Sequence, residues 1–215
     1  MPILPQLLNL GCSVFAFDFA GSGVSDGEYV SLGYYEQHDV RTVVEYLRES
    51  EMVTKIALWG HSMGAATALL YGSSDPSIAA MICDSTFSSL DSLARDVISS
   101  RFTRISVPFT SIIVQIARRH ILHTAEFDIC KVVPIDSARG TFIPALFMHG
   151  DVDELIPKSH SMDVHDAYPG DKELMIMEKV GHNTPRPDDA IESATLFLYR
   201  CLYLYNVEAI QADSE

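Results

Sequence analysis

Gly60-His61-Ser62-Met63-Gly64 has the pattern G-x-S-x-G, in which two glycines flank a central serine. An apolar run at residues 56–59 precedes the pattern, and a small-residue run at 65–71 follows it. A strand, a tight turn and a helix in this order hold a serine hydroxyl above a sheet in a strained conformation, and small residues at Gly60 and Gly64 make the turn possible. We therefore predict that Ser62 is a nucleophile and that the Met63 N–H, at the positive end of the helix, donates to a developing oxyanion.

A serine is a weak nucleophile by itself, so an acid and a base are expected further along the chain, in the order serine, acid, histidine. Asp153 lies in the loop after a predicted strand at residues 144–148, and His182 lies in the loop after a predicted strand at 173–180. The carboxyl ends of parallel strands share one edge of a sheet, where open α/β folds place their sites. These loops can therefore converge on Ser62.

Other carboxylates could orient the histidine. Asp151 and Glu154 share the loop of Asp153, and Asp84 ends a predicted strand at 79–83. For His61, within the turn, we predict packing away from the serine.

The remaining histidines and carboxylates do not suggest a bound ion. His149, His160 and His165 are expected to be structural or surface residues, since no His, Asp or Glu cluster has the spacing of metal ligands. We predict no metal and no cofactor.

The elements that would position these residues alternate along the chain. Apolar residues recur at helical spacing over residues 34–48, and a glycine-rich loop at 20–27 follows an apolar run at 13–17. The expected order is a buried strand at 13–17, helix 34–48, strand 55–59, helix 65–71, strands 79–83, 144–148 and 173–180, and helix 188–205. This order predicts an α/β fold with a mainly parallel sheet.

Residues 90–139 interrupt the alternation, and we interpret them as a mostly helical cap inserted in a single domain, 1–215. The chain has 215 residues, a formal net charge of −14 and 47% hydrophobic residues. This composition predicts a globular protein and argues against nucleic-acid binding. No segment reaches the roughly 18 apolar residues of a membrane span, and the four cysteines are single, so we expect a cytoplasmic location.

The motifs resemble those of α/β-hydrolase-fold serine hydrolases, the group with serine aminopeptidase-like, monoacylglycerol-lipase-like and protein-depalmitoylase-like members. The family pattern His-Gly-x-x-Asp falls on His149, Gly150 and Asp153, which implies Asp153 as the acid. Gly181-His182-Asn183 implies His182 as the base, and the loop at 18–26 is similar to the family's D-x-x-G-x-G-x-S stretch.

The resemblance implies cleavage of an ester, thioester or amide in a small-molecule, lipid or peptide substrate, with oligomeric state left open. Two alternatives remain: a peptidase of the same fold, and a catalytically impaired binding or scaffold protein.

The family also has a strand that supplies a second oxyanion donor, placed between the strands expected here at 13–17 and 55–59. Twelve residues precede Ser13, and residues 4–10 resemble the end of the helix that follows that strand. We therefore expect a chain truncated at its N-terminus, without the oxyanion strand and the N-terminal antiparallel strands.

Overall fold

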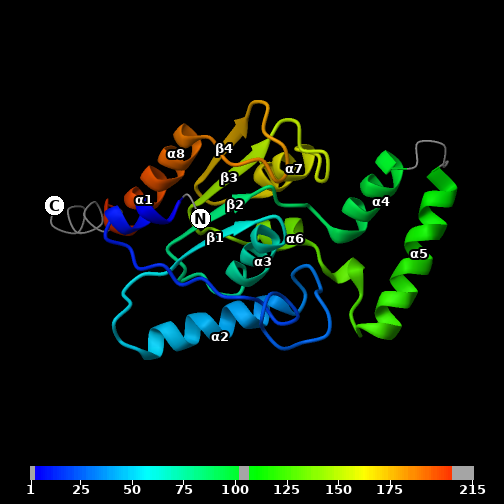
Figure 1. The fold of residues 1–215 in the computed structure, drawn as a ribbon, viewed down its shortest axis with the longest axis horizontal. Coiled ribbons are helices and arrows are strands. Elements are labelled where there is room, and N and C mark those ends of the chain that lie inside the picture. The colour runs from blue at the N-terminus through cyan, green and yellow to red at the C-terminus, as the bar shows by residue number, and fades with distance from the viewer. Residues whose placement is uncertain (1–2, 102–106, 205–215) are drawn as a thin grey trace.

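The computed structural model describes residues 3–101 and 107–204. Its centre is a parallel sheet with strand order β1-β2-β3-β4 (Figure 1). The strands are β1 (Ala57–His61), β2 (Ala80–Asp84), β3 (Ala145–Gly150) and β4 (Lys172–Met177). His61 lies opposite Asp84, and Asp84 opposite Met148, so the carboxyl ends of β1, β2 and β3 meet at one edge of the sheet.

Helices cover both faces of this sheet (Figure 1). The α-helices are α1 (Leu4–Asn9), α2 (Glu36–Glu49), α3 (Met63–Gly72), α4 (Leu90–Arg101), α5 (Val107–Thr124), α6 (Pro134–Ala138), α7 (Ser159–Ala167) and α8 (Asp188–Tyr199). A 3₁₀ turn spans Ile129–Lys131, and a π-helical turn spans Arg200–Leu204.

Two buried clusters follow from the alternation of side chains along the strands. Met81 and Cys83 of β2 face a cluster that includes residues of α2, α3, α6 and α7. Ala80 and Ile82 face the opposite cluster, to which α8 contributes and against which Leu7 of α1 packs. The sheet is therefore buried on both faces, as expected for a parallel sheet.

The alternating elements predicted for most of the chain are confirmed, with shifted ends. The helix expected at 34–48 is α2, and the strand expected at 55–59 is β1, two residues further along. The strand expected at 173–180 ends at Met177. The last helix, expected to reach 205, changes to a π-helical turn after Tyr199, and residue 205 lies outside the described residues.

The strand predicted at residues 13–17 is wrong. These residues form neither strand nor helix, and Phe15 has 52% of its surface exposed. A strand requires a neighbour to pair with, and in the described part of the chain β1 pairs with β2 alone. An apolar run alone is therefore not enough to make this segment a strand of the sheet.

The segment at 90–139 is mostly helical where it is described. Helices α4 and α5 stand apart from the three layers (Figure 1). A third buried cluster, which includes Ala66 of α3, Phe87 and Val114 of α5, joins them to the body of the protein.

Candidate active site

The serine of the G-x-S-x-G pattern occupies the turn between β1 and α3. Ser62 has φ 56° and ψ −116°, a conformation that an L-residue rarely adopts. A Cβ on Gly60 would overlap the backbone of Gly64, which explains the glycine at position 60. A Cβ on Gly64 would meet no atom within 4 Å, so the predicted need for a small side chain at position 64 is wrong. The close approach involves the backbone of Gly64 and not the space beside it.

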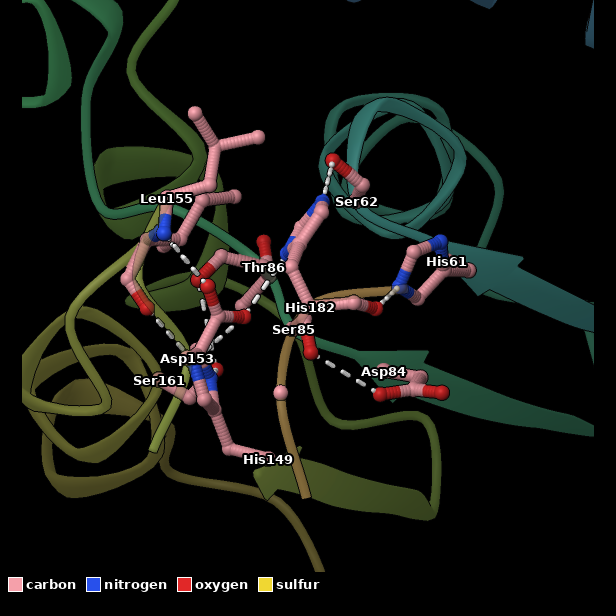
Figure 2. Close-up of polar contacts among 12 residues, drawn as sticks. His61, Ser62, Asp84, Ser85, Thr86, His149, Asp153, Leu155, Ser161 and His182 are labelled. Atoms are coloured by element: carbon pink, nitrogen blue, oxygen red, sulfur yellow. Dashed lines mark hydrogen bonds and ion pairs between the residues drawn. The ribbon is translucent and has the colours of Figure 1, made fainter. Parts of the chain in front are cut away.

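The three side chains predicted to form a triad lie within hydrogen-bonding distance of one another (Figure 2). The Nε2 atom of His182 is 3.0 Å from the Oγ atom of Ser62, and its Nδ1 atom is 2.7 Å from an Oδ atom of Asp153. The side chain of Asp153 is fully buried, and that of His182 is 8% exposed. The loops after β1, β3 and β4 thus bring together residues that are far apart in the sequence.

Hydrogen bonds keep Asp153 ionised despite its burial. Burial alone would raise the pKa of Asp153, but hydrogen bonds from His149 and His182 and from the backbone N–H groups of Ile156 and Leu155 hold this pKa well below its usual range. The two backbone groups lie 2.8 and 2.9 Å from the Oδ1 atom, which leaves Oδ2 toward His182. A charged carboxylate can fix the tautomer and orientation of an imidazole.

The rival carboxylates have other partners. The carboxylate of Asp84 forms a two-point ion pair with Arg186, at 2.7 and 2.9 Å. The carboxylate of Asp151 accepts a hydrogen bond from the Lys179 N–H at 2.6 Å. Glu154 is exposed. Of the four candidates, the structure places Asp153 against the histidine.

His61 differs from the expectation of a packing role. This residue is exposed, and its Nε2 atom lies 3.1 Å from the backbone carbonyl oxygen of His182. The two imidazole rings are 4.8 Å apart between centroids. His61 therefore joins the nucleophile turn to the loop of the candidate base, a contact that the sequence did not indicate.

The other histidines have structural partners. His149 is fully buried, and its Nδ1 atom lies 2.7 Å from the Ser161 hydroxyl (Figure 2). Its Nε2 atom lies 2.8 Å from the Ile156 carbonyl oxygen. His149 Nε2 also lies 3.4 Å from the Oδ2 atom of Asp153, so this histidine helps to hold the carboxylate in place. His160 bonds to Ser88 and Asp96, and His165 to Asp166.

Gly150, in the same motif as Asp153, allows the loops to approach each other. A Cβ at this position would overlap the carbonyl oxygen of Val180, just before His182. The glycine therefore lets the loop after β3 lie against the loop after β4, where the backbone N–H of Val152 donates to that carbonyl at 3.3 Å.

Met63 is the first residue of α3. The first N–H groups of a helix have no partner within the helix and point toward its N-terminal end, where negative charge is favoured. The N–H of Ser62 instead donates to the Asp84 carbonyl oxygen at 2.8 Å. In this turn, the Met63 N–H is therefore suited to donate a hydrogen bond to an oxygen that gains negative charge next to Ser62.

Comparison with known proteins agrees with this architecture. The family model described as serine aminopeptidase, S33, matches residues 2–123. The chain belongs to this family. The YqkD protein of Bacillus subtilis is 30% identical over 178 residues, which is 81% of this chain and 57% of YqkD. Human alpha/beta hydrolase domain-containing protein 17C is 25% identical over 175 residues, which is 81% of this chain and 45% of that protein.

Solved structures show the same fold. An esterase of Pyrococcus furiosus, Pf2001, superposes with a TM-score of 0.70 at 21% identity, covering 93% of this chain and 75% of the esterase. A monoacylglycerol lipase of Paleococcus ferrophilus gives 0.66 at 20% identity, covering 92% and 87%. The protein therefore has the α/β-hydrolase fold, and it spans about half the length of the curated relatives it matches.

No group of three or more His, Cys, Asp or Glu side chains could hold a metal ion among residues 3–101 and 107–204. Over the same ranges, no helix is long and apolar enough to cross a membrane.

Proposed function

We propose that this protein is a serine hydrolase that cleaves a carboxylic ester, thioester or amide through an acyl-enzyme. The observation that carries the proposal is the continuous chain of contacts from Ser62 through His182 to the buried Asp153. The family match and the esterase and lipase fold neighbours support the same reaction class.

In the proposed mechanism, the Ser62 hydroxyl attacks the substrate carbonyl carbon while His182 Nε2 accepts its proton. Asp153 accepts the hydrogen bond from Nδ1–H and stabilises the imidazolium that forms. The Met63 N–H donates to the oxyanion of the tetrahedral intermediate. His182 then protonates the leaving group, and a water molecule, activated by the same histidine, releases the acid and restores Ser62.

The substrate we propose is an acyl compound, either a small-molecule or a lipid ester. The neighbours that are named as an esterase and a monoacylglycerol lipase favour an ester. Peptide cleavage is the second candidate, because the matching family model is described as a serine aminopeptidase. The four cysteines are free thiols, which favours the cytoplasm as the place of action.

Hydrolysis of a short p-nitrophenyl ester tests the proposal. The wild-type chain should release p-nitrophenol, and Ser62→Ala should lower the rate by about 10⁴-fold or more. Ser100→Ala is the matched control, because within the described ranges this exposed hydroxyl donates only to the Val97 carbonyl oxygen, and its rate should equal the wild-type rate.

The Met63 N–H is the one oxyanion donor that we assign. Because the loss of one such donor slows turnover by about 10²- to 10³-fold, the wild-type rate is compared with the background rate of Ser62→Ala. A wild-type rate equal to that of Ser62→Ala would refute the hydrolase and favour the binding or scaffold alternative. Faster release from an aminoacyl p-nitroanilide than from the ester would favour the peptidase.

A further inference from the structure

Arg186 lies four residues after His182, and its guanidinium group uses all five of its N–H donors. Nε and Nη2 bind the two carboxylate oxygens of Asp84 at 2.7 and 2.9 Å, and Nη2 also donates to the Ser85 hydroxyl at 3.1 Å. Nη1 donates to the carbonyl oxygens of Gly181 at 3.0 Å and Thr184 at 2.8 Å. The guanidinium group therefore joins the end of β2 to the loop that contains His182.

This ion pair is largely buried. The side chain of Arg186 is 10% exposed and that of Asp84 is 6% exposed. Removing two charges from water is costly, and apolar residues in the place of such a pair often preserve stability, so a buried pair is weak evidence for a stabilising role. The geometry of its contacts is more informative than its energy.

Asp84 is connected to the backbone at Ser62 and, through Arg186, to the backbone next to His182. Its backbone carbonyl oxygen accepts the N–H of Ser62 at 2.8 Å, while its carboxylate holds Arg186, which holds the Gly181 carbonyl next to His182. His61 adds a second connection, from the nucleophile turn to the His182 carbonyl at 3.1 Å. The loop of the base is thus fastened to the end of β2 and to the turn of the nucleophile.

We propose that Arg186 and Asp84 are positioning residues that set the distance between His182 Nε2 and Ser62 Oγ. As far as catalysis is concerned, this proposal rests on the proposed function. Asp153 binds the Nδ1 atom of His182, while the Arg186 guanidinium group binds the backbone of the loop that contains His182. A planar fork with five donors is required here, because a lysine has three donors on one nitrogen and cannot reproduce the two-point contact.

The main test compares Arg186→Lys with Arg48→Lys. Arg48 forms an ion pair with Asp75 that joins α2 to the residues after α3, away from the three triad side chains. Arg186→Lys should lower kcat by about 10²-fold, the size expected for a displacement of about 1 Å, with KM unchanged. Arg48→Lys should keep the wild-type kcat. Added guanidinium ion at millimolar concentration should partly restore the kcat of Arg186→Ala and leave Arg48→Ala unaffected.

Asp84→Asn serves as a second variant if Arg186→Lys does not fold. This change keeps the backbone bond between the Asp84 carbonyl and Ser62 and removes only the carboxylate charge, so kcat should fall in the same direction. Thermal unfolding of each variant shows whether it is folded at the assay temperature. A loss of kcat in a folded variant, together with rescue by guanidinium, separates positioning from loss of stability.

A crystal structure of Arg186→Lys, or of Asp84→Asn, gives a readout that does not depend on activity. The His182 Nε2 to Ser62 Oγ distance should exceed ~3.5 Å, beyond hydrogen-bonding range. An unchanged distance would overturn the positioning proposal, as would a kcat equal to that of Arg48→Lys. If the wild-type chain has no hydrolytic activity, the proposed function fails, while the distance in the variant still decides whether the ion pair sets this geometry.

Discussion

At the scale of single residues, the environment of Asp153 combines complete burial with four hydrogen-bond donors. Burial would raise the pKa of this carboxyl group, and the donors more than compensate, which lowers it. The position of Asp153 could be predicted from its motif. Its support by His149 could not, because His149 lies near the end of β3 and Asp153 in the loop after it, and the sequence does not indicate which side chains turn inward.

The lowered pKa of Asp153 predicts an acid-sensitive contribution to stability. The unfolded chain has an ordinary aspartate pKa of about 3.9, and the folded value is lower. The contribution is therefore fully present above the unfolded pKa and is lost as the pH falls through it toward the folded pKa. Asp153→Asn should lower the free energy of unfolding most at neutral pH, and the difference from wild type should shrink between ~pH 5 and ~pH 2.

Urea unfolding at a series of pH values measures this difference. Asp166→Asn is the control, because the Asp166 side chain is 80% exposed, and its pH dependence should match that of the wild type. A constant difference between Asp153→Asn and wild type down to pH 2 would mean that the carboxylate is not stabilised by its donors.

At the scale of elements, β1, the turn and α3 act as one unit. The order strand, turn, helix could be predicted because the G-x-S-x-G pattern lies between two apolar runs. The different demands on the two glycines could not be predicted, because they depend on how closely β1 approaches α3. Gly60 faces the backbone of Gly64, while the space beside Gly64 is open.

This asymmetry predicts different effects of two equivalent substitutions. Gly60→Ala should lower both thermal stability and ester hydrolysis, because its methyl group would overlap the Gly64 backbone and displace Ser62. Gly64→Ala should leave stability unchanged or raise it by up to ~1 kcal/mol, since alanine is favoured over glycine within a helix. Thermal unfolding of both variants checks this, and equal losses would show that the turn is packed differently.

At the scale of the whole molecule, five strands were predicted from the sequence. Four are confirmed, and the first, at residues 13–17, is wrong. Residues 13–17 are apolar enough for a buried strand, yet Phe15 and Phe17 remain exposed and contact each other at 6.2 Å between ring centroids. Strand pairing depends on a neighbour that is distant in the sequence, so local pattern cannot determine it. The Arg186 and Asp84 pair was missed for the same reason, since 102 residues separate its members.

The convergence of three loops at one sheet edge could be predicted, because parallel strands place their carboxyl ends together. Ser62, Asp153 and His182 follow the ends of β1, β3 and β4. The parallel pairing of β1 to β4 aligns these three ends. This arrangement should make Ser62 more reactive than the other serines of the chain.

Covalent labelling of the wild-type chain with a fluorophosphonate, followed by mass spectrometry of its peptides, measures this reactivity. We expect one phosphonyl adduct, located on Ser62, and none in Ser62→Ala, because the base lies 3.0 Å from this hydroxyl. An adduct on another serine, or no adduct on a chain that is folded, would contradict it.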